Sequence, residues 1–180
     1  MDPSNNNSLL EAAEDGDIET IIKLNNLNKD LITQTDINGC NALHIAAIAG
    51  HTATVAQLNK LNENLITQTN NNGCNALHLA ATAGDTEIIA QLHELNDTLI
   101  TQTDNNGYNA LHLAAEAGHT EAVVELNNLN KDLITQTDKY GCNALHQVAY
   151  NGHTETLVKL HELNNNLITQ TDINRCNALH

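Results

Sequence analysis

The sequence predicts an all-α solenoid in which helix pairs stack in a row and are joined by short β-turn or hairpin fingers. Similar segments return every 34 residues, all nine glycines keep that step, and aromatic residues make up only 2% of the chain. A fixed period of roughly 20–50 residues is typical of repeat arrays, in which each unit packs only against its neighbours. A single compact core of this length would normally use large rings. The apolar residues here are Leu, Ile, Val and Ala, which suit closely stacked helices.

The repeated segment is GCNALH. Its copies begin at Gly39, Gly73, Gly107, Gly141 and Arg175. The third copy has Tyr108 in place of the cysteine, and the last has Arg175 in place of the glycine. The other glycines form a second column with the same step: Gly16, Gly50, Gly84, Gly118 and Gly152. The unusual residues of the chain therefore have positions set by the repeat.

The first half of each unit is predicted to be a turn followed by a short helix. In the unit 36–69 the polar segment DINGCN contains Asn-Gly, a strong turn signal. Asn41 is a good N-cap for a helix that begins at Ala42. The helix is short and rich in alanine, and Gly50 ends it in the manner of a C′ glycine.

The second half of the unit is predicted to be another helix and a returning loop. Thr52 is expected to cap this helix. Three residues spaced three apart form its apolar face: Val55, Leu58 and Leu61. The segment NENLITQT then leads to the next turn, and we expect its Leu65 and Ile66 to pack beneath the helices.

These features resemble the ankyrin repeat family. One copy reads DNNGYNALHLAAEAGHTEAVVELNNL at Asp104–Leu129 and combines a turn, an Ala-Ala pair, Gly-His and a leucine-rich second helix. The resemblance covers about residues 8 to 180 and implies five helix pairs. Three features depart from the family pattern. Asn-Ala-Leu-His replaces Thr-Pro-Leu-His, NxxLITQTD replaces the usual Gly-Ala-Asp link, and the unit is one residue longer than usual.

The chain is expected to form one repeat domain over 8–180, after a disordered tail over 1–7. The domain divides into a cap repeat and later units: 8–35, 36–69, 70–103, 104–137, 138–171 and a partial repeat 172–180. Arg175 stands where a positive φ is expected, at a cost of about 1 kcal/mol, so we expect fraying there. Because another first helix would begin near His180, we expect either a longer native protein or a truncated gene.

Metal binding and catalysis are disfavoured by the pattern of their candidate residues. Cys40, His44 and His51 are plausible zinc ligands by type. However, Tyr108 interrupts the cysteine column, aspartates interrupt the column of His51, and neither CxxC nor HxxxH occurs. A nucleophilic cysteine also needs an oriented base, which several near-identical copies do not provide. We expect no metal, no cofactor and no enzyme activity, and we expect His44 to bridge the cap and a neighbouring loop.

The four cysteines are expected to be free thiols: Cys40, Cys74, Cys142 and Cys176. Stacked helices lie about 8–10 Å apart, which exceeds the roughly 7 Å limit between bridged Cα atoms. Free thiols fit a reducing compartment. The N-terminus has neither the basic nor the apolar region of a signal peptide, and no stretch is long enough to span a membrane. We expect a cytoplasmic protein, or one acting in the host-cell cytosol if it is a secreted effector.

The net charge is −15, with 7 Lys and Arg against 22 Asp and Glu. Nucleic acids and anionic membranes are therefore poor partners, because phosphate binding relies on basic clusters. Aromatic platforms for single strands are missing as well. An acidic array favours basic or neutral protein surfaces, although a solvated acidic surface alone would account for most of these charges.

Differences between repeats suggest where a partner binds. By the family resemblance, a groove is lined by the turn tips and the ends of the first helices. The units 36–69 and 70–103 carry small or neutral residues there, whereas the next two units differ. The resulting candidate partner-binding residues are Tyr108, Glu116, Lys139, Tyr140, Tyr150 and Asn151. Tyrosine is enriched in binding hot spots. The alternative is that Tyr150 only fills a gap beside Val148.

The sequence therefore predicts a monomeric, non-enzymatic scaffold that binds a partner protein of unknown identity. One alternative is the targeting or scaffold portion of a longer protein, such as a bacterial effector or enzyme, with its activity beyond residue 180. A metal-binding array and a relic without a partner are two further alternatives.

Overall fold

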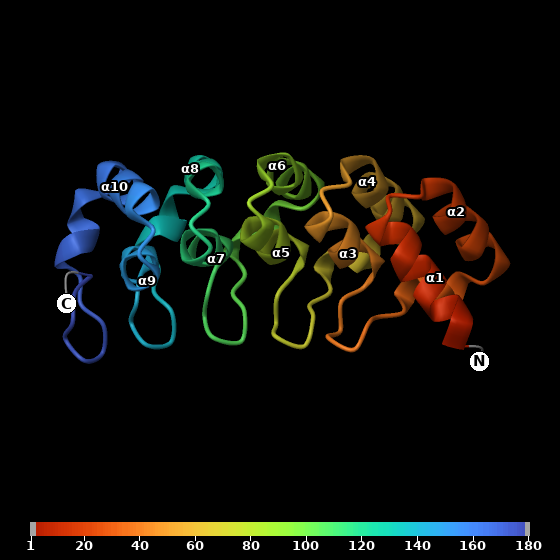
Figure 1. Cartoon of the computed structure of the whole chain (residues 1–180), viewed down its shortest axis with the longest axis horizontal. Coiled ribbons are helices and arrows are strands. Elements are labelled where there is room, and N and C mark those ends of the chain that lie inside the picture. Colours follow the sequence, from red (N-terminus) through yellow and green to blue (C-terminus); the bar gives the residue numbers. More distant parts are fainter. Residues whose placement is uncertain (1–2, 179–180) are drawn as a thin grey trace.

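The computed structural model describes residues 3–178, and side chains within residues 9–178. Five helix pairs lie in a row between the two ends of the chain (Figure 1). The first helices are α1 (Pro3–Glu14), α3 (Ala42–Ile48), α5 (Ala76–Ala83), α7 (Ala110–Glu116) and α9 (Ala144–Asn151). The second helices are α2 (Ile18–Leu27), α4 (Thr52–Leu61), α6 (Thr86–Leu95), α8 (Thr120–Leu129) and α10 (Thr154–Leu163).

Each second helix is followed by one turn of 3₁₀ helix. These turns are η1 (Lys29–Thr33), η2 (Glu63–Thr67), η3 (Asp97–Thr101), η4 (Lys131–Thr135) and η5 (Asn165–Thr169). Five loops then project from one side of the molecule (Figure 1). We call them fingers 1 to 5 and define them as residues 36–41, 70–75, 104–109, 138–143 and 172–177. Within the described range there is no strand, and the only isolated bridge joins Thr35 and Asn41. The predicted all-α solenoid of five helix pairs is confirmed.

The core is a continuous row of small and branched apolar side chains. The first helices contribute pairs such as Ala46 and Ala47, and the second helices contribute residues such as Val55 and Leu58. Ala-Ala pairs let successive first helices approach closely, so each helix is covered by its neighbours on both sides. As predicted, Leu65 is fully buried and so are its equivalents in later units. No helix in the described residues is long and apolar enough to cross a membrane.

Two local predictions differ from the structure. Helix α1 already begins at Pro3, so residues 3–7 of the expected tail are helical here, while residues 1–2 lie outside the described range. Proline is tolerated in a first helical turn because its missing N–H would have no partner there. Thr52 was expected to cap α4, but it is the first helical residue and His51 occupies the cap position without a side-chain cap bond.

His51 instead joins its unit to the preceding one. Its Nε2 lies 2.8 Å from the carbonyl oxygen of Glu14, the last residue of α1. His119 and His153 repeat this contact, with distances of 3.0 and 2.9 Å to the carbonyl oxygens at the end of the preceding first helix. The ring lies against the glycine of that unit, and a Cβ on Gly84 would come within 2.6 Å of the His119 ring. The Gly-His pattern is therefore a contact between neighbouring units, which we call the histidine clamp.

We expect Arg175→Gly to raise the free energy of unfolding by about 1 kcal/mol. Arg175 has φ 66°, the only positive φ outside glycine in the described range. Chemical denaturation of both proteins measures the difference. The reciprocal change Gly141→Arg should destabilise by at least as much, because a Cβ there would also lie 3.2 Å from the Ile173 nitrogen. Equal stability of Arg175→Gly and the parent chain would contradict the strain.

Candidate protein-binding groove

The fingers are rigid turns closed by an acidic or amide side chain. In finger 1, Oδ1 of Asp36 accepts hydrogen bonds from the backbone N–H groups of Asn38 (2.9 Å) and Cys40 (2.7 Å). The turn glycine, Gly39, has φ 79°. The same pair of bonds recurs in the other fingers, where the accepting side chains are Asn70, Asp104, Asp138 and Asp172. Every finger therefore presents its tip in the same conformation.

A ladder of hydrogen bonds connects neighbouring finger tips. The backbone N–H of Asn71 donates to the Asn38 carbonyl at 2.9 Å, and each later finger repeats this bond to the finger before it. Side chains add a second rung: Nδ2 of Asn71 donates to the Ile37 carbonyl at 3.1 Å, and Lys139 donates to the Asn105 carbonyl. The tips thus form one continuous edge beside the first helices.

A buried node of asparagine, histidine and glutamine holds each finger on its helix. Oδ1 of Asn41 accepts the His44 backbone N–H (2.9 Å), and Nδ1 of His44 accepts the Asn41 backbone N–H (3.1 Å). The Asn41 amide also donates to the Leu65 carbonyl (3.1 Å) and to Oε1 of Gln68 (2.8 Å). His44 Nε2 lies 3.1 Å from the Gln68 carbonyl, so His44 bridges the cap and the following loop as predicted.

The node recurs around three further buried asparagines: Asn75, Asn109 and Asn143. Two departures from the family pattern, the asparagine at the cap position and the LITQT segment, are therefore coupled through these hydrogen bonds. A threonine at this position could provide the cap oxygen, but its single hydroxyl proton could not serve both loop acceptors. The two protons of the asparagine amide serve a loop carbonyl and the Gln of the LITQT segment at once.

The buried imidazoles are neutral. Burial lowers the pKa of His44 and of His112 to about 4, and it also lowers the pKa of His78. In His44, Nδ1 accepts a hydrogen bond, so the proton lies on Nε2, which donates to the Gln68 carbonyl. Protonation of Nδ1 would remove the acceptor of the node. The Nε2 bond of His44 is not repeated everywhere: among the described residues, Nε2 of His78 and of His112 is buried without a hydrogen-bond partner. All three rings are removed from solvent and serve the node through Nδ1.

The six predicted partner-binding residues lie on the side of the fingers and first helices. Tyr150 lies in the last turn of α9, and its side chain is 90% exposed. Tyr140 lies at the tip of finger 4 and is 58% exposed. The others exposed are Glu116, Lys139 and Asn151. Lys139 and Tyr140 are neighbours at the tip of finger 4. Asn151 is held by its own helix, where its Nδ2 donates to the Gln147 carbonyl.

Tyr108 differs from the other two tyrosines, because it is partly buried and its hydroxyl is bonded. Nε2 of Gln147 donates to the Tyr108 hydroxyl at 3.0 Å and approaches Oδ2 of Asp138 at 3.3 Å. The Tyr108 ring stacks on His112, with centroids 5.8 Å apart. Burial, together with Asp138 and Glu116, raises the pKa of the Tyr108 hydroxyl. Tyr108 therefore presents one fixed ring edge to the groove.

Gln147 is a groove residue that the sequence reading missed. The equivalent positions of earlier units hold Ile45, Leu79 and Leu113, so the polar residue occurs only where Tyr108 lies opposite in the preceding unit. The two departures from the repeat occur together and meet in space. Tyr108 and Gln147 are 39 residues apart, which is one repeat period plus five residues, and this spacing was the only sequence signal that the two side chains meet.

A cavity of about 680 Å³ lies between α9 and finger 5. Tyr150 lines it together with Cys142, His146, Gln147, Asp172 and Cys176. Of the six predicted residues only Tyr150 is among its lining residues. Its lining combines apolar and polar side chains and includes one carboxylate, that of Asp172.

The thiols do not form a reactive or metal-binding cluster in the described residues. No group of three or more His, Cys, Asp or Glu side chains there could hold a metal ion. Burial raises the pKa of Cys40, Cys142 and Cys74, in the last case to about 11. All four cysteines are free. Because the thiolate is the nucleophile, the raised pKa values make Cys40, Cys74 and Cys142 unreactive at neutral pH.

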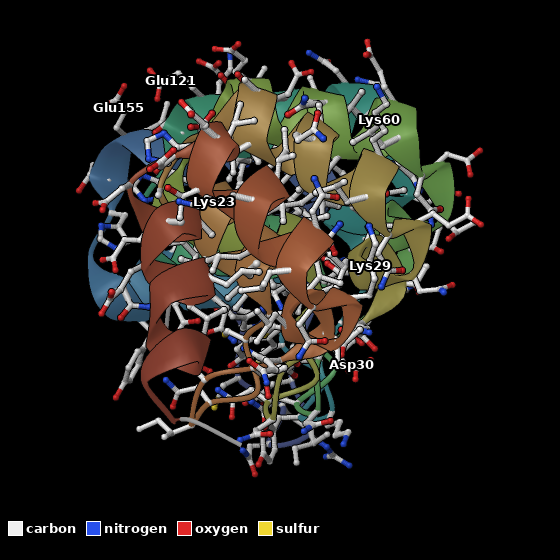
Figure 2. All side chains as sticks on the ribbon, turned by 90° about the vertical axis from the view of Figure 1, so that its right-hand side faces the viewer. Lys23, Lys29, Asp30, Lys60, Glu121 and Glu155 are labelled. Atoms are coloured by element: carbon white, nitrogen blue, oxygen red, sulfur yellow. The ribbon has the colours of Figure 1, made fainter. Side chains whose placement is uncertain are left out.

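Charges lie mainly away from the groove. Figure 2 shows Glu121, Glu155 and Lys60 on the side of the molecule opposite the fingers. Between α8 and α10 a surface cleft is lined by Glu121, Glu155 and Glu162 together with Val158. The single ion pair of the described residues joins Lys159 and Glu162 at 3.2 Å on that surface. A solvated acidic face of this kind contributes to solubility.

The chain matches the model of a known protein family. A family model described as ankyrin repeats (three copies) matches residues 9–104, 58–135 and 83–174. The overlapping matches cover nearly all of the described chain and confirm the resemblance drawn from the repeated motif. No curated protein matches the sequence.

We expect Asn109→Thr to lower the free energy of unfolding by about 1–3 kcal/mol. Threonine keeps an oxygen to accept the His112 N–H, but it has one hydroxyl proton in place of two amide protons, so the Leu133 carbonyl and Gln136 Oε1 cannot both keep a donor. Urea denaturation measures the loss. Asn109→Ala also removes the cap and should cost more than Asn109→Thr. A threonine variant as stable as the parent would show that the donated bonds contribute nothing.

We expect the free energy of unfolding to fall as the pH drops from about 6.5 toward 5.5. The unfolded chain binds protons at His44 and His112 near their ordinary pKa of 6.5, whereas the folded chain binds them only near pH 4. The unfolded state therefore takes up more protons in this window, and stability is lost as the pH falls. Most carboxylates stay ionised there. Denaturation midpoints that are flat or rise on acidification would contradict this.

Proposed function

Because the chain belongs to the ankyrin repeat family, whose members are generally protein–protein interaction modules, we propose that it binds a partner protein along its finger tips and first helices. The observation that carries this proposal is the exposure of Tyr140 and Tyr150 on that side. An exposed tyrosine supplies apolar area and a polar tip at a small loss of rotamer entropy. Such residues dominate the binding energy of protein interfaces.

The two exposed tyrosines are proposed to be the anchors of the interface. The ring of Tyr108 is proposed to form a rigid part of the groove surface beside them. Glu116, Lys139 and Asn151 are proposed to form the polar rim. Gln147 holds the Tyr108 hydroxyl and thereby fixes the ring before a partner arrives. Preorganisation of this kind reduces the entropy lost on binding.

The partner is proposed to be a protein with a basic or neutral surface, and the chain a non-enzymatic monomer. The net charge of −15 supports this partner class and disfavours nucleic acids and anionic membranes. The raised thiol pKa values and the buried, neutral histidines support a role without catalysis. Four free cysteines support a reducing compartment such as the cytoplasm.

The test compares wild-type chain with Tyr140→Ala/Tyr150→Ala as bait for proteins in a cell lysate. Captured proteins are identified and their affinity for both baits is then measured. Loss of two hot-spot side chains should weaken binding by at least about thirtyfold. Both tyrosines are exposed, so circular dichroism and denaturation midpoints should be unchanged.

A matched control removes exposed apolar side chains from the second helices. Leu27 is 74% exposed and Val158 is 51% exposed, so Leu27→Ala/Val158→Ala deletes similar side chains from the other side. We expect this control to bind as the wild type does. Equal binding by the tyrosine variant, or loss of binding only in the control, would overturn the proposed groove.

A further inference from the structure

We propose that Asn72, at the tip of finger 2, is a selective site of spontaneous deamidation. The chain contains four Asn-Gly pairs: Asn38–Gly39, Asn72–Gly73, Asn106–Gly107 and Asn151–Gly152. Asn-Gly is a favourable sequence for this reaction because glycine has no side chain to hinder the approach of its nitrogen. The structure distinguishes the four sites, and this inference does not depend on the binding function.

The reaction needs only water. The backbone nitrogen of glycine attacks Cγ of the preceding asparagine, an N–Cγ bond forms, and the Cγ–Nδ2 bond breaks. Ammonia leaves with the proton of the glycine nitrogen. Water then opens the cyclic imide at either carbonyl and gives aspartate or isoaspartate. The asparagine side chain must therefore be free to turn toward the next residue.

In fingers 1 and 3 that side chain is held back. Nδ2 of Asn38 donates to Oδ2 of Asp36 at 3.3 Å, and Nδ2 of Asn106 donates to Oδ2 of Asp104 at 3.5 Å. In both fingers the other carboxylate oxygen closes the turn. One aspartate thus fixes the turn and the asparagine amide together.

Finger 2 has Asn70 where fingers 1 and 3 have aspartate. Its Oδ1 still closes the turn, with bonds of 3.0 Å from the N–H groups of Asn72 and Cys74. Its second branch is an NH₂ group, which approaches Sγ of Cys40 at 3.7 Å. An NH₂ group cannot accept from another amide, so within the described residues the exposed Asn72 side chain has no hydrogen-bond partner.

The charge of the side chain that closes each turn also favours deamidation at Asn72. Attack requires the glycine nitrogen to lose its proton, and a carboxylate next to it disfavours the developing negative charge. Asp36 and Asp104 place such a carboxylate beside Gly39 and Gly107. Asn70 is neutral, so Gly73 lacks this protection.

The fourth pair is protected by its helix. Asn151 is the last residue of α9, and its Nδ2 donates to the Gln147 carbonyl at 3.0 Å. The helical backbone keeps the side chain away from the Gly152 nitrogen. The glycine N–H groups do not distinguish the four pairs, because each donates to the backbone carbonyl three residues earlier. Among the Asn-Gly pairs of the described residues, only Asn72–Gly73 has an exposed asparagine amide without a hydrogen bond and a neutral side chain closing its turn.

Modification at this position would alter the finger ladder at its centre. The Asn72 carbonyl accepts the Asn105 N–H at 2.9 Å. Isoaspartate adds one methylene group to the main chain and would displace this carbonyl, and either product adds one negative charge. In the isoaspartate product, fingers 2 and 3 would lose the backbone hydrogen bond that joins them.

The experiment incubates the purified folded chain at mildly alkaline pH and follows each Asn-Gly peptide by mass spectrometry. Isoaspartate is distinguished by electron-transfer fragmentation. We expect Asn72 to convert about fivefold faster than Asn38 or Asn106, the factor that corresponds to one hydrogen bond of ordinary strength. Asn151 should be slowest. In urea, where the folded contacts are lost, the four rates should converge.

Two variants test the cause. Asn70→Asp gives finger 2 the aspartate of its neighbours and should slow Asn72 to the rate of Asn38. Asp104→Asn should accelerate Asn106 to the rate of Asn72, with circular dichroism confirming the fold. Equal rates at the three fingers of the folded chain would overturn the proposal. So would an Asn72 rate that Asn70→Asp leaves unchanged.

Discussion

The buried node of asparagine, histidine and glutamine is the constraint on which the rest of the structure depends. Around Asn41 it satisfies the free N–H groups at the start of a helix and at the same time ties the loop that ends the unit. An unpaired polar group in this position would cost about 1–3 kcal/mol, so all members of the node must be present together. The neutral imidazole of His44 is as necessary as the amide.

This node separates the parts of the chain that are fixed from the parts that vary. The node asparagine and the LITQT segment repeat unchanged because they must form the same buried bonds in each unit. The finger tips and helix ends project beyond the node, and there Tyr108, Lys139 and Tyr150 depart from the earlier units without disturbing it. Recognition can therefore change in one unit while packing between units stays the same.

The sequence alone predicted the elements whose signals are local. Asn41 as a cap, Gly50 as a helix end and the positive φ of Arg175 all follow from the chemistry of single residues and their neighbours. The fold class followed from the 34-residue period. The cap assigned to Thr52 was wrong because the helix begins one residue earlier than expected, at Thr52 itself, which places His51 in the cap position. The short apolar segments beneath the helices were correctly buried, but they are too brief to show a helical period.

The candidate site was less predictable, because its residues meet across the repeat. The tyrosines and their polar neighbours were found by comparing equivalent positions, and their role in binding stays a prediction. Gln147 was missed since a polar residue on a helix usually faces solvent. Only the arrangement of units places it against Tyr108. The bond from Asn41 to Gln68 spans 27 residues and has no local signal either.

The histidine clamp is missing at one junction, and this gives the array an internal boundary. Asp85 stands where the clamp would join the units 36–69 and 70–103, and it caps α6 instead. A bond from Gln91 to the Thr52 carbonyl connects these units, at 2.9 Å. Glutamine is a flexible side chain that loses more entropy when it is fixed than an imidazole packed on glycine. In a linear array each unit is coupled only to its nearest neighbours. The units 36–69 and 70–103 are therefore joined through Gln91, the finger ladder and the packed first helices, and the proposed tyrosine anchors all lie on the C-terminal side of this junction.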